Sequence, residues 1–310
     1  MEAGPPSLMV GSVRSGPDAL CTAAGKPHRP LVFRREVEVG RNMKEARFYI
    51  TARGVYEAAI NGSGEERILG TDESWKWAYG PVESSELYYG EMYDFNAQLS
   101  EKLTWNEVKC QRITDNLVAP DGPPVGKTQD FVSRKILRTP LGKMVVDLGQ
   151  NMVGRIRVSV DGPRGTAINF QFVEVLEDGE VVTRTPRDRK AKDTPVLPGT
   201  RGDGRAEWEP KFAFQGFRYV EVENWPGKLE NGDIKGTVVH TDIRETGSFS
   251  CSSPLLNKLH EIFRWSMQGN FLNIPTDCPQ RDERLGLTGG INAFADTANY
   301  PHDSAGMLSS

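Results

Sequence analysis

The hairpin that decides the fold reads Arg155-Ile156-Arg157-Val158-Ser159-Val160, then Asp161-Gly162-Pro163-Arg164-Gly165, then Thr166-Ala167-Ile168-Asn169-Phe170-Gln171-Phe172. Its first segment alternates apolar and polar residues with a period of two, and its middle segment has the composition of a turn. The third segment is therefore expected to pair back on the first as an antiparallel strand. The chain is predicted to be mainly β.

The segments around this hairpin extend the same pattern. Residues 144–154 are expected to form a strand, a turn and a bend, and residues 234–240 a closing strand. Four aromatic residues between positions 212 and 219 are expected in the core. Residues 177–206 are charged and rich in turn formers, which indicates a mobile loop. A second antiparallel β-sandwich is thus predicted over residues 119–246, starting in the proline-rich linker 119–124.

The N-terminal part contains weaker signals of the same kind. Residues 1–28 include Pro5-Pro6 and many small residues, and we expect a disordered leader there. Strand-like segments at 31–39, 46–52 and 55–62 predict a first β-sandwich over residues 29–118. The aromatic residues between 75 and 93 have two interpretations: a surface that stacks on sugar rings, or rings that cover an interface between two sandwiches.

The pattern changes to a helical period after residue 252. Ser252-Ser253-Pro254 has the composition of a capped helix start. The apolar residues that follow lie on one face of a predicted helix over residues 254–271: Leu255, Leu256, Leu259, Ile262, Phe263 and Met267. An apolar face of this size needs a partner, so self-association through this helix is expected.

A dense polar motif follows the predicted helix. Six ionisable side chains fall within the eight positions 277–284: Asp277, Cys278, Arg281, Asp282, Glu283 and Arg284. Carboxylates beside guanidinium groups are held charged and oriented, and an acid beside a second carboxylate can have its pKa raised into the range useful for proton donation. Glycoside hydrolysis uses such a pair of carboxylates. The alternative is a solvated loop laced with ion pairs.

The amino-acid sequence of the motif resembles that of a known family. Residues 276–286, followed by Thr288-Gly289, closely resemble the signature of the α-L-rhamnosidases of glycoside hydrolase family 78. The resemblance implies that residues 247–310 begin an (α/α)6 barrel, so the fold class is antiparallel β-sandwich modules followed by the first helices of an incomplete barrel. It implies an inverting hydrolase that releases terminal α-L-rhamnose.

The family's roles transfer to residues of the motif. Glu283 matches the general acid, and Asp277 and Arg281 match residues that bind rhamnose hydroxyls, while Asp282 either holds its neighbours or is solvated. The family's catalytic base lies downstream in the barrel, and no residue here corresponds to it. An internal deletion joined near Ser63-Gly64 is also expected, which makes the chain resemble a truncated member.

Two positions depart from the family pattern. Leu287 and Gly290 stand where the family usually has an aromatic residue and an acid, and Asp296 is a candidate substitute for that acid. The alternative function is therefore a catalytically inactive, rhamnosidase-derived protein that acts as a carbohydrate-binding or protein-interaction module.

Composition excludes other classes. A net charge of −4 leaves no basic excess to neutralise phosphates, so no nucleic-acid partner is expected. The four histidines and four cysteines have no metal-ligand spacing, and neither a metal nor another cofactor is predicted. The cysteines are expected to be reduced and mostly buried rather than paired in disulfides. No signal peptide is evident and no stretch approaches ~20 apolar residues. We expect a soluble protein without a membrane partner, in a compartment that stays unassigned.

Overall fold

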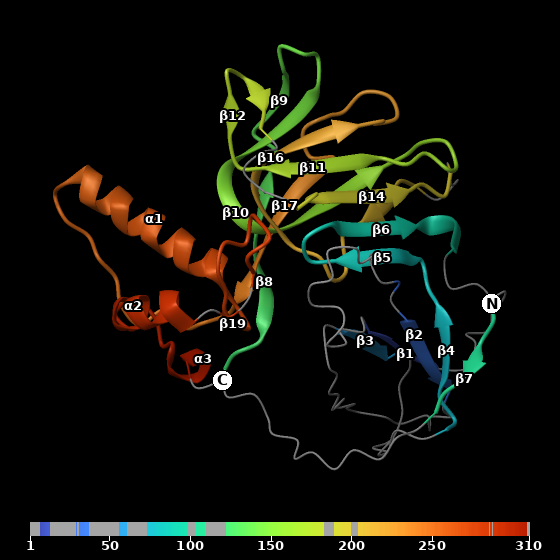
Figure 1. Cartoon of the computed structure of the whole chain (residues 1–310). Coiled ribbons are helices and arrows are strands. Elements are labelled where there is room, and N and C mark those ends of the chain that lie inside the picture. Colours follow the sequence, from blue (N-terminus) through green and yellow to red (C-terminus); the bar gives the residue numbers. More distant parts are fainter. Residues whose placement is uncertain are drawn as a thin grey trace. The chain divides into compact units, whose positions relative to one another are not determined.

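The chain folds into two compact units, residues 1–86 with 91–115 and residues 87–90 with 116–310. The structure, a computed structural model, describes residues 7–12, 29, 31–36, 56–60, 73–97, 103–109, 122–182, 189–199, 204–284, 286 and 288–308. Strands make up most of the ordered elements, and helices follow residue 253 (Figure 1). The prediction of a mainly β chain with helices towards its C-terminus is confirmed.

The first unit contains an antiparallel sheet with the strand order β3-β1-β2-β4-β7. Its strands are β1 (Ser7–Ser12), β2 (Leu31–Glu36), β3 (Tyr56–Ile60), β4 (Lys76–Tyr79) and β7 (Asn106–Glu107). Strand β5 (Val82–Glu86), strand β6 (Gly90–Asp94) and the short 3-10 helix η1 (Phe95–Ala97) lie between β4 and β7 in the chain. The predicted strands at 31–39 and 55–62 correspond to β2 and β3, whereas 46–52 and the join at Ser63-Gly64 lie outside the described residues.

Strand β1 corrects the expectation of a disordered leader. It pairs along its whole length with β2 on one side and along five residues with β3 on the other. A strand with a hydrogen-bonded neighbour on each side has its backbone donors and acceptors satisfied. The prediction for residues 1–28 was therefore wrong for these six residues.

The second unit is built on a larger antiparallel sheet, whose strands follow the order β14-β11-β16-β10-β17-β8, with β9 and β15 also paired to β10. The bounds are β8 (Val125–Val132), β9 (Lys135–Arg138), β10 (Met144–Val160), β11 (Asn169–Val173), β14 (Lys192–Val196), β15 (Ala206–Trp208), β16 (Gln215–Glu223) and β17 (Ile234–Thr241). The hairpin of the opening stretch is present: residues 155–160 belong to β10, and β11 begins at Asn169.

Strand β10 differs from the predicted strand, turn and bend at residues 144–154. It is a single strand of 17 residues, and its pairing register with β16 shifts between Asp147 and Met152. Gly149, at φ 81°, adopts the left-handed backbone that this bulge requires, and its N–H donates to Asp147 Oδ1 at 2.7 Å. The Arg218 side chain donates to both carboxylate oxygens of Asp147, at 2.8 and 3.0 Å. The polar turn is thus a bulge held within a curled sheet.

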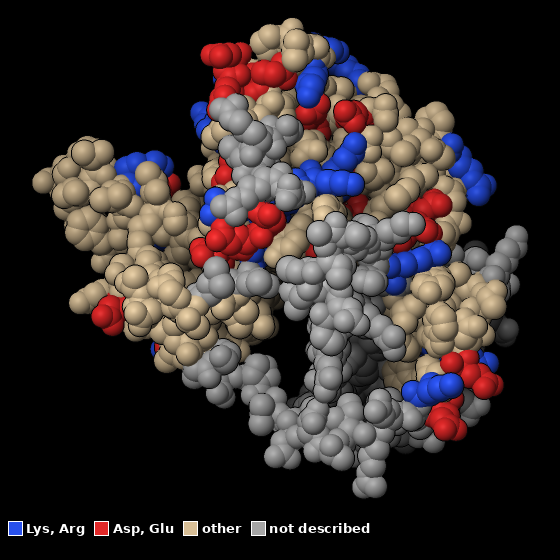
Figure 2. Space-filling view, viewed as in Figure 1, with Lys and Arg blue, Asp and Glu red and all other residues tan. Residues whose placement is uncertain are grey.

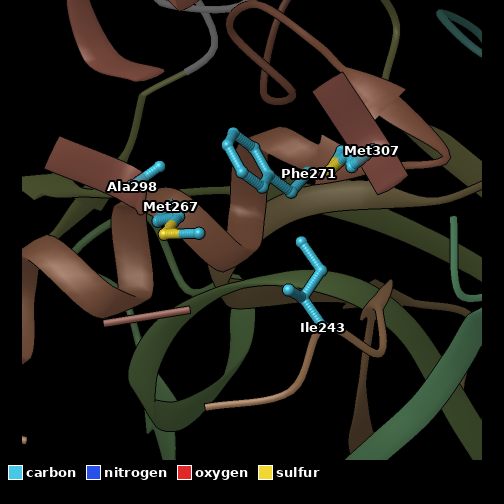
Figure 3. Packing of buried hydrophobic residues seen from close by; sticks show 5 residues of the cluster. All are labelled: Ile243, Met267, Phe271, Ala298 and Met307. Atoms are coloured by element: carbon cyan, nitrogen blue, oxygen red, sulfur yellow. The ribbon is translucent and has the colours of Figure 1, made fainter. Parts of the chain in front are cut away.

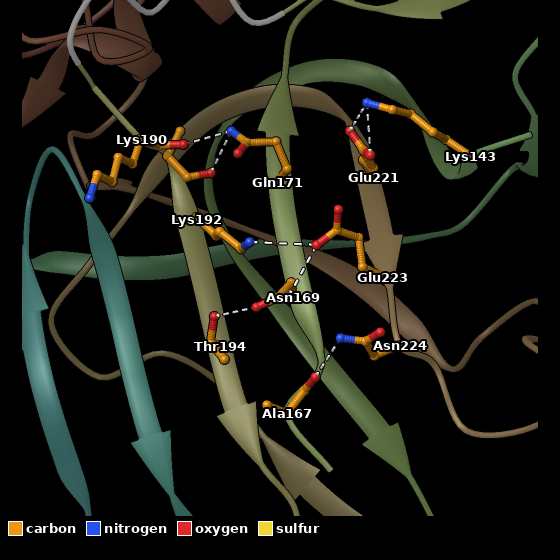
Figure 4. Close-up of polar contacts among 11 residues, drawn as sticks. Lys143, Ala167, Asn169, Gln171, Lys190, Lys192, Thr194, Glu221, Glu223 and Asn224 are labelled. Carbon is orange, nitrogen blue, oxygen red and sulfur yellow. Dashed lines mark hydrogen bonds and ion pairs between the residues drawn. The ribbon is translucent and has the colours of Figure 1, made fainter. Parts of the chain in front are cut away.

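The two faces of this sheet separate apolar from polar side chains. Phe170, Phe172 and Val220 are fully buried on one face. Of the four aromatic residues expected in the core between positions 212 and 219, Phe212 and Phe217 are buried, whereas Phe214 and Tyr219 are only partly buried. On the opposite face, Glu223 accepts from Asn169 and Lys192, as Figure 4 shows. This period-2 segregation along β11 and β16 is what fixes their register. Acidic and basic side chains are interspersed over the described surface in the view of Figure 2.

The expected mobile loop at 177–206 is in part ordered. A short hairpin of β12 (Leu176–Glu177) and β13 (Glu180–Val181) opens it, and β14 pairs with β11 through Lys192 and Asp193. Charged and polar residues are present in this segment because the polar face of β14 hydrogen-bonds to neighbouring strands, as Figure 4 shows, so the composition does not indicate mobility there. Residues 183–188 and 200–203 lie outside the described residues.

Helix α1 (Pro254–Asn270) confirms the predicted helix over 254–271. Ser253 occupies the N-cap position but makes no side-chain cap hydrogen bond. Instead, the Asn257 amide accepts from the Cys251 N–H at 2.9 Å and donates to the Cys251 carbonyl at 2.8 Å. The helix start is therefore fixed by an amide one turn inside the helix.

The remaining elements pack around the C-terminal end of α1. They are β18 (Phe271–Leu272), β19 (Ile274–Pro275), α2 (Thr288–Ala298) and α3 (Ala305–Leu308). Figure 3 shows the buried cluster that joins these helices to the segment after β17, formed by Ile243, Met267, Phe271, Ala298 and Met307. Among the described residues, no helix has the length and apolar character needed to span a bilayer.

Candidate functional site

The polar motif begins in a tight hairpin at the end of α1. Asn273, in the left-handed region at φ 66°, turns the chain between β18 and β19, and its N–H donates to Thr241 Oγ1 at 2.7 Å. The Thr276 N–H and hydroxyl both donate to the Asn270 carbonyl, at 2.6 and 3.0 Å. The start of the motif is therefore tied to both α1 and β17.

Arg284 fastens the other end of the motif to the sheet. Its side chain is buried, with the residue 4% exposed. Nη1 donates to the Phe214 carbonyl at 2.6 Å and Nη2 to Gln215 Oε1 at 3.2 Å. The guanidinium also lies over the rings of Phe214, at 4.8 Å, and Tyr88, at 6.0 Å. A planar fork that is hydrogen-bonded and stacked is a rigid attachment.

Two further contacts hold the middle of the motif, one from Arg189 and one from Gly216 on strand β16. Arg189, also 4% exposed, donates from Nη1 to the Pro279 carbonyl at 3.3 Å. At Gly216, a Cβ would lie 3.0 Å from the backbone nitrogen and Cβ of Gln280. Only glycine permits so close an approach of the motif to the sheet without displacement.

The charged residues of the motif pair as the alternation of signs suggests. Arg281 Nη2 lies 2.6 Å from Glu283 Oε2, and both side chains are about one-third exposed. Burial raises the pKa of the Cys278 thiol, the Asp277 and Glu283 carboxylates raise it further, and Arg281 opposes them. Asp277, Arg281 and Glu283 therefore surround one thiol, at a residue whose backbone is left-handed at φ 45°.

A cavity of about 290 Å³ opens beside Asp277. Its walls come from α1, β19 and α2: Ser266, Met267, Asn270, Phe271, Pro275, Thr276, Asp277, Gly290, Ile291 and Phe294. The volume is just below the range of ~300–1,000 Å³ typical of ligand pockets.

The predicted site residues take different places relative to this cavity. Asp277 lines the cavity, whereas Glu283 does not. Both carboxylates lie near the Cys278 thiol and raise its pKa. Asp282 is partly buried, and Asp296 lies exposed on α2 outside the lining. Gly290 lines the cavity without a side chain, at the position where the family pattern has an acidic residue. Leu287 lies outside the described residues.

Sequence reasoning missed the residues that hold the motif in place. The sequence identifies Arg284 only as one of six ionisable groups and indicates no role in the motif for Arg189, Gln215 or Tyr88. The residues that these hydrogen bonds join are far apart in the chain: Arg284 and Gln215 are separated by 69 positions, and Arg189 and Pro279 by 90. No local pattern carries that information.

Other ligand chemistry has limited support in the described part of the chain. No group of three or more His, Cys, Asp or Glu side chains there is placed to hold a metal ion. Cys251 and Cys278 are free thiols, and the other two cysteines lie outside the described residues.

Three sequence models of one family match the chain in order. They are the alpha-L-rhamnosidase N-terminal domain at residues 63–129, the bacterial alpha-L-rhamnosidase concanavalin-like domain at 137–240, and the bacterial alpha-L-rhamnosidase 6 hairpin glycosidase domain at 244–310. The last of these contains the polar motif and the helices α1, α2 and α3.

Individual relatives agree. An alpha-L-rhamnosidase of Streptomyces avermitilis is 40% identical over 258 residues, which are 80% of this chain and 25% of that protein. The crystal structure of native alpha-L-rhamnosidase from Aspergillus terreus has a TM-score of 0.73 and 40% identity, covering 90% of this chain and 30% of that one. The Streptomyces avermitilis enzyme complexed with L-rhamnose has a TM-score of 0.70 and 36% identity, covering 90% and 26%.

This chain thus spans between a quarter and a third of the length of these relatives. The three consecutive domain matches, the last of which includes the polar motif after α1, nevertheless all come from α-L-rhamnosidases. The chain belongs to the α-L-rhamnosidase family, glycoside hydrolase family 78.

Proposed function

We propose that residues 273–286 form the sugar-binding and proton-donating half of a hydrolase that releases terminal α-L-rhamnose with inversion. The observation that carries this proposal is the cavity at Asp277. Phe271, Ile291 and Phe294 give it apolar walls, while Asn270 and Asp277 give it polar groups. A sugar ring has apolar C–H faces and a rim of hydroxyls, and therefore suits a cavity of this mixed character.

Glu283 is the proposed general acid, which protonates the glycosidic oxygen. In the present structure Glu283 forms an ion pair with Arg281, whose Nη2 lies 2.6 Å from Glu283 Oε2. We propose that the rhamnose hydroxyls draw Arg281 away when the sugar binds. The Glu283 side chain is then released from this ion pair and can face the glycosidic oxygen.

Inversion requires a second carboxylate on the opposite side of the sugar, ~6.5–9.5 Å from the first. No residue of this chain has been assigned that role. Sugar binding and hydrolysis are therefore separate predictions, and they need separate measurements.

The first test is turnover of an aryl α-L-rhamnoside by this chain. Glu283→Gln should abolish turnover, and Glu261→Gln, an exposed substitution on α1, should leave it unchanged. Calorimetry with L-rhamnose is the second test, in which Asp277→Asn should remove binding. Turnover that survives in Glu283→Gln would exclude Glu283 as the acid.

A binding module without catalysis is the second candidate. It is favoured by Gly290, which leaves the cavity wall without the carboxylate usual in the family. Saturable binding of L-rhamnose, lost in Asp277→Asn and unaccompanied by turnover, is the result expected of such a module.

We also propose that the chain self-associates through α1. Four of its large apolar side chains remain about half exposed or more: Leu255, Leu256, Leu259 and Ile262. Sedimentation velocity should reveal concentration-dependent association that Leu259→Glu weakens. A monomer at high concentration would contradict this proposal.

A further inference from the structure

A second cavity, of about 390 Å³, lies in the second unit away from the polar motif. It is enclosed by β8, β17, the segment that leaves β17, helix α1 and the turn after α2. The lining residues are Thr128, Gln129, Val238, His240, Asp242, Ile243, Arg244, Glu245, Arg264, Gln268 and His302. None of them belongs to the cavity at Asp277.

Two buried histidines line this cavity. His302 is 4% exposed, and its Nδ1 atom is buried without a hydrogen-bond partner in the described part of the chain. His240 is 9% exposed, and its Nδ1 lies 2.7 Å from the Thr241 carbonyl, so its Nε2 remains for another group. A buried polar atom left without a partner is destabilising, and a ligand in the cavity that hydrogen-bonds to it would remove that cost.

The charged residues of the lining are largely paired with one another or with near neighbours. Arg264 forms an ion pair with Glu245, and Arg244 donates to Asp303 at 2.9 Å. Burial lowers the pKa of His302, and the nearby Arg264 guanidinium lowers it further, so its imidazole is neutral at neutral pH. A neutral imidazole offers one donor and one acceptor.

These features select the chemistry of the ligand. The paired arginines leave little net positive charge to attract an anion, and the described residues contain no metal-binding group. Apart from Val238 and Ile243 the lining side chains are polar, with amides at Gln129 and Gln268 that donate as well as accept. Hydroxyl groups also do both. A neutral polyol therefore matches the lining better than an anion, a cation or an apolar molecule.

We propose that this cavity is a second carbohydrate site, which binds one monosaccharide unit with a sugar hydroxyl at His302 Nδ1. The site is independent of the catalytic function proposed above, because it shares no lining residue with the cavity at Asp277. Its volume falls within the ~300–1,000 Å³ typical of small-molecule pockets.

The test uses the imidazole NMR signals of the full chain, titrated in parallel with L-rhamnose, D-glucose and inorganic phosphate. At least one of the two sugars should produce a saturable change in the His302 signals. Gln268→Ala should weaken this binding about five- to tenfold, the change expected for one lost hydrogen bond. Glu261→Ala, also on α1 but outside the lining, should bind as the unmodified chain does.

Separate variants distinguish this site from the proposed active site. Asp277→Asn should leave the His302 response intact even if it removes binding at the other cavity. His302→Phe should remove the response, and Thr128→Val provides a second variant should that substitution impair folding. No saturable response to either sugar, a response lost in Asp277→Asn, or a response to phosphate alone would overturn the proposal.

Discussion

Replacement of Arg284 tests whether the β-sheet holds the sugar-site motif in place. Arg284→Met keeps an unbranched side chain of similar length but removes the guanidinium. The substitution deprives the Phe214 carbonyl and Gln215 Oε1 of their donors at 2.6 and 3.2 Å and ends the stacking on Phe214. Arg284 is 4% exposed, so solvent does not easily replace the lost donor.

The magnitude follows from these contacts. A hydrogen bond from a charged donor contributes ~1.5–3 kcal/mol, and a cation–π contact about 0.5–2 kcal/mol. Part of this sum is recovered because the variant no longer desolvates a charge. We therefore expect the free energy of unfolding of the second unit to fall by about 3 kcal/mol, which lowers its melting temperature by ~6–12 °C.

The assay is urea denaturation combined with hydrogen exchange read by mass spectrometry, which reports each unit separately. Residues 276–284 should exchange faster in Arg284→Met than in the unmodified chain. Arg284→Lys should behave in nearly the same way, because an ammonium group does not reproduce the planar fork. Arg244→Met is the control: its guanidinium is mostly exposed and should contribute under ~1 kcal/mol. A loss below ~1 kcal/mol in Arg284→Met, with unchanged exchange of the motif, would refute the reasoning.

Three other substitutions test the site and the sheet. Gly216→Ala places a Cβ 3.0 Å from Gln280 and should lower the free energy of unfolding, measured by urea denaturation, by about 1–3 kcal/mol. Gly126→Ala is the control, because its Cβ would meet nothing within 4 Å, and it should lower the free energy of unfolding far less. Equal losses in the two variants would contradict the packing argument. Although burial alone would raise it, the Arg218 guanidinium and the Gly149 N–H hold the pKa of Asp147 below its ordinary value of 3.8. The stability from this pair is therefore fully present above that value and is lost as the pH falls through the lower folded-state pKa, and Asp147→Asn should flatten the acid side of the stability–pH curve. Burial and the carboxylates of Asp277 and Glu283 raise the pKa of the Cys278 thiol, so Glu283→Gln should lower that pKa. Alkylation of Cys278 by iodoacetamide at neutral pH should then be faster, with Cys251 as the internal reference. An unchanged rate would place Glu283 away from the thiol.

Local periodicity carried much of the fold. Alternation with a period of two predicts the second half of β10, and apolar residues at helical spacing predict α1 to within one residue of its C-terminal end. These patterns are readable because each reports which face of an element is buried, and that property is repeated along the element itself.

The candidate site was predictable only in part. The alternation of acidic and basic side chains predicts ion pairs within the motif, and Arg281 and Glu283 form one. The cavity at Asp277 does not follow from the motif, because α2 supplies Gly290, Ile291 and Phe294 to its wall. Neither composition nor spacing states where α2 folds back against α1.

The errors have the same origin. Ser7–Ser12 is a strand because β2 and β3 pair with it, and residues 144–160 form one strand because Arg218, 71 positions after Asp147, stabilises the bulge. By itself, therefore, the sequence determined the class of each strongly periodic element and the identity of the charged motif. The tertiary structure alone decided what the motif rests on, since Arg284 and Arg189 find their partners through chain segments that are distant in sequence, and such contacts leave no local periodicity.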